Sequence, residues 1–318
     1  MALPREEEAR VPAFFIRSAR GALAALAALA LGGCHMVLLE PSGDVAVQEG
    51  HLLVVSTVLM LLIIVPVIVL TLLFAWWYRQ SSSEAVYAPD WDHSIQLELV
   101  IWAAPLLIII ALGAVTWIST HTLDPYRPLS RVDPEHGIPG EGKPLTVEAV
   151  ALDWKWLFLY PDQGIAVVNE LAAPVDVPIH FRITAESVMN SFFIPALAGQ
   201  IYAMPGMETQ LYAVINRNGQ YEGFSANYSG AGFSGMHFQF RGMAAADFER
   251  WVQAAKESGG ELNRQTYQVL RQPSEREPVR RYAVVAADLY DAILNRCVEP
   301  GTICIKDMMS MSAHRGRD

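Results

Sequence analysis

The sequence predicts a membrane protein built from an α-helical hairpin of two transmembrane helices, followed by an all-β sandwich and a short helical C-terminal tail. Three observations lead to this fold class. The chain of 318 residues is 52% hydrophobic and only 18% charged, a composition too apolar for an ordinary soluble protein. Two long runs near the N-terminus contain no charged residue. Further along the chain, apolar and polar residues alternate with period two, which is typical of half-buried strands.

The two uncharged runs are each long enough to cross a bilayer, which takes about 20 apolar residues. The first covers residues 50–78 and the second residues 99–123. We expect the helices at about 51–78 and 97–121, inside an N-terminal segment of residues 34–123. Two core helices of a soluble protein are the alternative, which runs of this length disfavour.

Residues 1–33 have the pattern of a secretory signal peptide, with basic residues, a short run of Ala and Leu, and then small residues. Together with Cys34 the segment ends in Leu-Gly-Gly-Cys, which resembles the bacterial lipobox. Cleavage there would leave Cys34 as an N-terminus that carries palmitate or another acyl chain. An ordinary signal whose cleavage site adjoins a Cys is the alternative.

The signal also predicts the orientation. If Cys34 is outside, the loop of residues 79–96 is cytoplasmic and everything beyond Asp124 is periplasmic. We therefore expect a lipid-anchored protein of the bacterial inner membrane, in contact with membrane lipid, whose C-terminal domain lies in the periplasm. The formal net charge of −10 disfavours nucleic acid as a partner.

The outer part of the chain begins with a linker rich in Pro and Gly, residues 124–143, and continues with the predicted sandwich, residues 144–243. The alternation is clearest in residues 174–184, where Val, Ile and Phe fall on one face. His180 falls on the polar face and is predicted at the surface. From residue 244 the period becomes helical, and we expect residues 244–318 to pack against the sandwich or a partner subunit.

Only three Cys occur, Cys34, Cys297 and Cys304. In an oxidising compartment the last two could close a small disulfide loop. The alternative is two unpaired thiols in the tail, and both remain open.

These features together resemble subunit II of the haem-copper respiratory oxidases, over nearly the whole chain. Four stretches carry the resemblance: Leu97–Trp102 with Pro105, Asp153–Trp156, Ile201–Gly206, and the DFERW segment at 247–251. The resemblance implies a cupredoxin-like fold for the sandwich. Trp154 and Trp156 are expected as large side chains that brace it.

In the cytochrome c oxidases of this family, the sandwich holds two copper ions bridged by two thiolates, with imidazoles, a thioether and a backbone carbonyl as further ligands. Their ligands follow a His before Ser, aromatic and Pro, and then a loop C-x-E-x-C-G-x-x-H-x-x-M. This sequence aligns with that pattern without a gap. The aligned residues are Asn190 at the first His, Ser225 and Ser229 at the two Cys, Asn227 at the Glu, Phe233 at the second His, and Met236 at the Met.

The alignment implies a copper site that has kept its frame and lost its ligands. A Ser hydroxyl is not deprotonated near neutral pH, and Phe233 has no donor atom. His237 is a poor substitute, because in an extended segment the residue after Met236 points to the other face. We therefore expect no metal and no catalytic residue in this chain, and Met236 as part of the core.

Loss of copper is the pattern of the quinol-oxidising branch of the family. In that branch the haems, the remaining copper and the quinol site belong mainly to subunit I. The resemblance thus implies a non-catalytic subunit of a proton-pumping ubiquinol oxidase, with subunit I and the other subunits as partners and no cofactor of its own. Such a subunit would serve assembly and shielding.

Two other functions are the alternatives. A copper-bearing cytochrome c oxidase subunit is disfavoured by the aligned ligand positions, and a free-standing binding lipoprotein would lack a haem-containing partner.

One acid, Glu98, lies at the predicted cytoplasmic mouth of the second helix, where an ionisable group is a functional candidate. The resemblance implies that it marks a proton entrance into subunit I. An interfacial carboxylate that faces water is the alternative.

Overall fold

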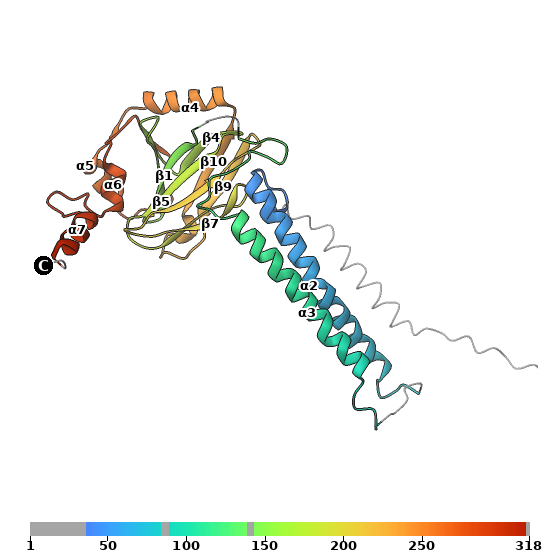
Figure 1. Cartoon of the computed structure of the whole chain (residues 1–318). Coiled ribbons are helices and arrows are strands. Elements are labelled where there is room, and N and C mark those ends of the chain that lie inside the picture. The colour runs from blue at the N-terminus through green and yellow to red at the C-terminus, as the bar shows by residue number, and fades with distance from the viewer. Residues whose placement is uncertain (1–35, 84–88, 139–142, 316–318) are drawn as a thin grey trace, which may run out of the picture. The chain divides into compact units, whose positions relative to one another are not determined.

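The computed structural model describes residues 36–83, 89–138 and 143–315, so the predicted signal peptide and Cys34 lie outside the described residues. Figure 1 shows the elements coloured along the chain. The helices are η1 (Val37–Leu39), α2 (Asp44–Trp77), α3 (Ile95–Thr122), η2 (Phe233–Gly235), α4 (Ala245–Glu257), α5 (Arg264–Leu270), α6 (Leu289–Leu294) and α7 (Ile305–Arg315). The strands are β1 (Leu145–Leu152), β2 (Lys155–Tyr160), β3 (Ile165–Val168), β4 (Glu170–Pro174), β5 (Ile179–Ala185), β6 (Asn190–Ile194), β7 (Ala198–Ala203), β8 (Thr209–Ala213), β9 (Gly219–Ser225), β10 (His237–Met243), β11 (Glu261–Leu262), β12 (Arg280–Tyr282) and β13 (Val284–Val285).

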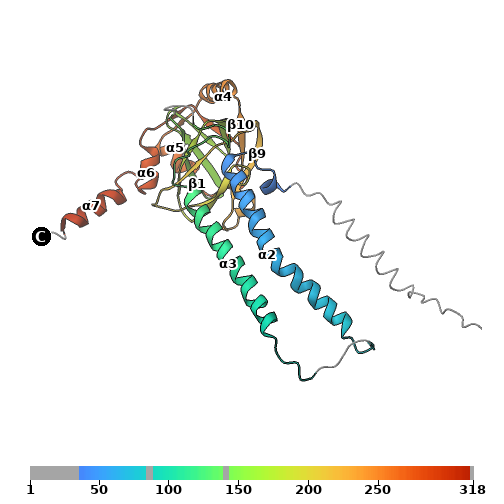
Figure 2. The ribbon, with the colours of Figure 1, turned by 45° about the vertical axis from the view of Figure 1, so that its right-hand side comes forward.

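Helices α2 and α3 form the predicted hairpin and lie side by side (Figures 1 and 2). Both are long and apolar enough to cross a membrane, and their apolar stretches are not buried within the chain. Helix α3 has about the expected bounds, but α2 begins at Asp44, well before the expected residue 51. The first residues of α2 are buried against the sandwich, and the apolar run marks only the part of the helix that is not buried within the chain.

The start of α2 is held against the sandwich by its backbone. Ser42 and Gly43 both donate their N–H groups to Ala196 O, at 2.9 and 3.0 Å, and Asn216 N donates to Ser42 O at 2.8 Å. A Cβ on Gly43 would lie 2.4 Å from Val214 O. Only a glycine allows this close approach of two backbones.

A buried ion pair completes this junction. Asp44 is only 3% exposed, and its two carboxylate oxygens accept hydrogen bonds from Arg131 Nε and Nη2 at 2.9 and 3.0 Å. Gln48 Nε2 donates to the same carboxylate at 2.8 Å. The bidentate geometry supplies the partners that a buried carboxylate requires, and it joins the first turn of α2 to the linker between α3 and the sandwich.

Two sheets make the sandwich. One has six strands in the order β12-β3-β2-β1-β5-β8, and the other has five in the order β4-β10-β9-β6-β7. The predicted alternation is present in β5, where Ile179, Phe181 and Ile183 are buried. His180, predicted at the surface, is half-buried, because its ring stacks on Tyr212 with centroids 4.3 Å apart.

The main core lies between the sheets and is rich in aromatic rings. Trp156 and Phe158 of β2 contact Phe192 of β6 and Phe238 of β10, with ring centroids 4.9 to 6.3 Å apart. The rings of Phe192 and Phe238 stack at 5.5 Å with an interplanar angle of 7°. Helix α4 adds Phe248 to the same core.

The six-stranded sheet is covered on its other face as well, which the alternation did not predict. Its outward residues, such as Leu157 and Leu159, form a second core with the C-terminal region, including Tyr267 and Ile293. The prediction of a purely helical tail was incomplete, because β12 joins the six-stranded sheet through antiparallel pairing with β3. A three-residue strand is too short to give a periodic signal.

A polar cluster lies on this covered face. Arg182 of β5 lies 2.6 Å from Glu148 Oε1 and 2.8 Å from Glu208 Oε2, and its guanidinium lies 4.8 Å from the ring centroid of Tyr290. One guanidinium thus serves two carboxylates. Burial, with smaller contributions from the carboxylates of Asp291 and Glu208, raises the pKa of Glu148 to about 7 despite the opposing charge of Arg182.

The raised pKa of Glu148 makes the stability of the folded chain depend on pH. An unfolded glutamate titrates near about 4.3, so between that pH and about 7 the folded chain holds a proton on Glu148 that the unfolded chain has lost. We expect stability to fall as pH rises through this window and to level off above it. Glu148→Gln should flatten this dependence and give a higher unfolding midpoint than the wild type at pH 8, measured by thermal melting at pH 5 and pH 8.

Glu249→Gln is the matched control, because Glu249 is an exposed carboxylate on α4. It should leave the pH dependence of the wild type intact. Equal pH dependence in wild type and Glu148→Gln would show that Glu148 titrates normally.

Candidate functional site

The candidate site is the loop between β9 and β10, together with the start of β6. Asn190 opens β6 and Ser225 ends β9. The two strands are antiparallel neighbours, in the register Phe192 with Ser225. Strand pairing therefore brings Asn190 and Ser225 together, although 35 residues separate them along the chain.

Direct hydrogen bonds join three of the predicted positions. Ser225 Oγ donates to Asn190 Oδ1 at 3.0 Å, and both side chains are buried. Ser225 N donates to Met236 O at 3.1 Å. The positions aligned with a His, a Cys and a Met therefore meet in one place, where a neutral hydrogen bond now joins the first two.

The other predicted positions lie along the loop. Asn227 Nδ2 donates to Met189 O at 3.3 Å, and Ser225 Oγ lies 3.4 Å from Asn227 O. The ring of Phe233 packs edge-on against Tyr228, with centroids 5.7 Å apart. Aromatic packing thus occupies the position of the second imidazole.

Ser229, aligned with the second Cys, is held through its backbone. Its carbonyl oxygen accepts a hydrogen bond from Trp154 Nε1 at 3.1 Å. Its Oγ is buried and has no hydrogen-bond partner among the residues that the structure describes. The hydroxyl is therefore a polar group that the present packing does not use.

Trp154 shapes the loop around the site. A Cβ on Gly232 would lie 2.5 Å from the Trp154 ring, and Gly230 adopts a φ of +116°. Both glycines are therefore needed for the loop to lie against this ring. Trp154 is itself only partly buried, whereas Trp156 is fully buried in the main core.

Met236 and His237 point in opposite directions, as the sequence predicted. Met236 is fully buried in the core. His237 is exposed, and its Nδ1 lies 2.7 Å from Glu222 Oε1. The imidazole nearest in sequence to the site is therefore turned away from it.

The side chains of this site do not fit a binuclear copper centre. Bridging copper ions need thiolates, and the site offers two hydroxyls, two amides, one phenyl ring and one thioether. Within the described parts of the chain, no three His, Cys, Asp or Glu side chains form a group that could hold a metal ion. What the site can do is support the loop through hydrogen bonds and packing.

The other candidate residues lie away from this site. Glu98 is in the first turn of α3 and is exposed. Cys297 and Cys304 form a disulfide in the structure, with Cα atoms 4.8 Å apart.

Sequence reasoning missed the charged residues at the start of α2. A signal was present, because Asp44 is an acid in the first turn of a helix, where the helix dipole favours negative charge. It missed the cluster around Arg182 as well, whose members come from separate parts of the chain.

Comparisons with known proteins agree with this geometry. Residues 162–242 match the family model of the cytochrome c oxidase subunit II periplasmic domain, and residues 256–301 match the COX aromatic rich motif. The cytochrome bo(3) ubiquinol oxidase subunit 2 of Pseudomonas putida is 48% identical, over 87% of this chain and 85% of the relative.

Two further relatives extend the comparison. The ubiquinol oxidase subunit 2 of Acetobacter aceti is 49% identical over 84% of each chain. The quinol oxidase subunit 2 of Bacillus subtilis is 36% identical, over 76% of this chain and 74% of the relative. At these identities over most of each chain, this chain belongs to the family of quinol oxidase subunit 2, and its outer domain matches the periplasmic domain of cytochrome c oxidase subunit II.

Proposed function

We propose that this chain is the non-catalytic second subunit of an inner-membrane, proton-pumping ubiquinol oxidase, a complex that passes electrons from ubiquinol to oxygen. The hydrogen bond between Ser225 Oγ and Asn190 Oδ1 carries the proposal. It joins two positions at which an electron-accepting subunit would need a thiolate and an imidazole. A subunit without this centre cannot take electrons from a periplasmic carrier, whereas quinol arrives through the membrane.

The partners follow from the same reasoning. Haems, copper and the quinol site are proposed to belong to subunit I, and this chain is proposed to bind none of these cofactors. Its two helices expose apolar side chains along their length, which suits packing against lipid and against other membrane helices. The chain then serves assembly and shields the periplasmic side of the complex.

Isolation of the assembly tests the proposal. An affinity tag at the C-terminus should recover haem-containing subunits from membranes, with ubiquinol-dependent oxygen consumption and a haem absorption spectrum. Recovery of the chain alone would favour a free-standing lipoprotein. Oxygen consumption with reduced cytochrome c but not with ubiquinol would favour the cytochrome c oxidase function.

We predict that the frame of the copper site persists and that restoring the ligands restores the centre. The variant combines Asn190→His, Ser225→Cys, Asn227→Glu, Ser229→Cys and Phe233→His, with Met236 retained. Copper should then give the visible and paramagnetic resonance spectra of an electron shared between two ions, which the unmodified complex should lack.

The matched control omits Ser229→Cys and keeps the other four substitutions. With one bridging thiolate missing, the binuclear spectrum should be lost. The same spectrum in the unmodified chain, or its absence in the five-fold variant at wild-type assembly, would contradict the alignment.

Glu98 is proposed as part of a proton entrance on the cytoplasmic side. Glu98→Gln keeps the shape and removes the titrating group, so oxygen reduction should slow severalfold while assembly stays intact. Turnover and its pH profile are the measurements, with Asp92→Asn as the control because Asp92 is an exposed acid just before the same helix. Unchanged turnover in Glu98→Gln would mean a carboxylate that only faces water.

The N-terminus is proposed to be processed and acylated at Cys34. Intact-mass analysis should show a chain that starts at Cys34 and carries the added mass of acyl groups. Cys34→Ala should remain in the membrane, because α2 and α3 already anchor it. A chain that retains Met1 or carries an unmodified Cys34 would refute this proposal.

A further inference from the structure

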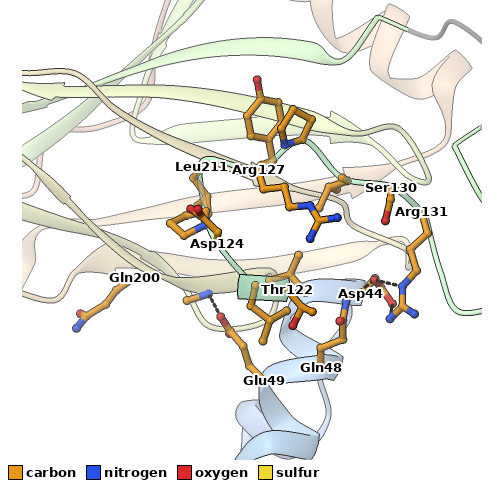
Figure 3. A pocket seen from close by; sticks show the side chains of 17 residues that line it. Asp44, Gln48, Glu49, Thr122, Asp124, Arg127, Ser130, Arg131, Gln200 and Leu211 are labelled. Atoms are coloured by element: carbon orange, nitrogen blue, oxygen red, sulfur yellow. Dashed lines mark hydrogen bonds and ion pairs between the residues drawn. The ribbon is translucent and has the colours of Figure 1, made fainter. Parts of the chain in front are cut away.

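A cavity of about 480 Å³ lies where the hairpin meets the sandwich. It is lined by the first turns of α2, by the end of α3 with the linker that follows, and by Gly199, Gln200, Leu211 and Tyr212 of β7 and β8 (Figure 3). Its volume lies within the range of roughly 300–1,000 Å³ that is usual for small-ligand sites. The apolar runs of both helices end beside it, so it lies at the level where lipid headgroups are found.

Two of the charged groups that line the cavity form an ion pair with each other. Asp44 and Arg131 form the bidentate pair described above. Arg127 is exposed, and its guanidinium donates a long hydrogen bond of 3.4 Å to His121 O. Within the described residues it forms no ion pair, and its guanidinium points into the cavity (Figure 3).

Glu49 is the second charged group without a counter-ion. Its Oε1 accepts a hydrogen bond from Gly199 N at 3.0 Å, and the residue is partly buried. In the part of the chain that the structure describes, no cation pairs with it. The cavity therefore offers an anion-binding Arg127 and a cation-binding Glu49 on separate walls.

The cavity continues into an apolar groove between the two helices. This groove of about 300 Å³ is lined mainly by Leu52, Val55, Val115 and Ile118, and it shares Gln48, Thr122 and Leu123 with the cavity. A polar cavity that opens into an apolar groove along two membrane helices has the form of a site for an amphipathic molecule.

We propose that the cavity binds one phospholipid with a primary-amine headgroup, of the phosphatidylethanolamine class. Arg127 binds the phosphate and Glu49 accepts hydrogen bonds from the ammonium group. One acyl chain lies in the groove beside Val115. The lipid then connects the hairpin to the sandwich at the surface of the membrane.

The charges select this headgroup over the other common ones. The lining holds three carboxylates, Asp44, Glu49 and Asp124, and two guanidinium groups, so an added anionic lipid would leave an excess of negative charge. A choline headgroup has no N–H to donate to Glu49. An ethanolamine headgroup is a zwitterion that satisfies both Arg127 and Glu49.

The test uses the full chain purified from membranes with the subunits that accompany it, and it does not depend on oxidase activity. Micelles contain equal amounts of phosphatidylethanolamine, phosphatidylglycerol and phosphatidylcholine with identical acyl chains. Native mass spectrometry measures the lipid that is retained. The wild type should retain one phosphatidylethanolamine in preference to the other two.

Three variants separate the contributions. Glu49→Gln keeps the acceptor for Gly199 N and should reduce the preference for phosphatidylethanolamine about tenfold, because a hydrogen bond to a charged group is lost. Arg127→Gln should weaken retention of all three phospholipids. Val115→Trp should fill the groove and weaken retention while leaving the charges intact.

Lys256→Gln and Glu249→Gln are the controls, because both residues are exposed on α4 and do not line the cavity. They should behave as the wild type. Equal lipid retention in wild type, Glu49→Gln and Arg127→Gln would overturn the proposal. So would a structure of the assembly in which a quinone or a segment of another subunit fills the cavity.

Discussion

The stacking of Phe192 on Phe238 is the contact on which the frame of the candidate site depends. Phe192 lies two residues after Asn190, and Phe238 lies two residues after Met236, so this one ring pair joins β6 and β10 directly beneath the site. Space for it exists because Gly223 has no side chain, since a Cβ there would lie 2.1 Å from the Phe238 ring. Aromatic burial of this kind contributes more than any single polar contact in the loop. The positions that align with copper ligands are therefore held by the packing of the core.

Sequence reasoning succeeded where the signal was local. The apolar runs gave the hairpin, the alternation gave β5, and the spacing of Ser225, Ser229 and Met236 matched a known ligand pattern. It failed where the partner lies far along the chain. Arg131 reaches Asp44 across 87 residues, and Asn169 Nδ2 donates to Glu277 O across 108. The helical period of residues 244–318 predicted packing against the sandwich or a partner subunit, and the second core shows that the sandwich is covered. No periodicity in a strand reveals which face will be covered, so the place of the second core and the strand β12 were not predicted.

The C-terminal region contributes to the structure of the sandwich through the second core and through a buried carboxylate, Glu170. Glu170 is 2% exposed and accepts hydrogen bonds from Trp251 Nε1 of α4 at 2.7 Å and from Arg281 Nη2 of β12 at 3.0 Å. A buried carboxylate with only one of these partners would be costly. Arg241 of β10 lies near the same carboxylate, with Nε 3.5 Å from Oε1. Glu170 thus joins helix α4 and strand β12 to the sheet that contains β4 and β10. The C-terminal region is thus a structural part of the sandwich, which leaves its opposite, exposed surface as the part available to other subunits.

Metal-binding loops are usually held in shape partly by the metal, so the loss of ligands would be expected to loosen them. In this chain the loop between β9 and β10 is held by contacts with neighbouring parts of the sandwich. Trp154 packs on Gly232 and donates to Ser229 O, β9 and β10 pair along their length, and Ser225 is tied to Asn190. Some of these contacts are made by residues that do not align with a copper ligand. The others are made by Asn190, Ser225 and Ser229, which align with ligands but are not His or Cys. Within the described residues the buried Ser229 Oγ has no hydrogen-bond partner, so this side chain does not help to hold the loop. A frame held in this way can lose its redox chemistry while its outer surface, which a partner subunit would contact, stays unchanged.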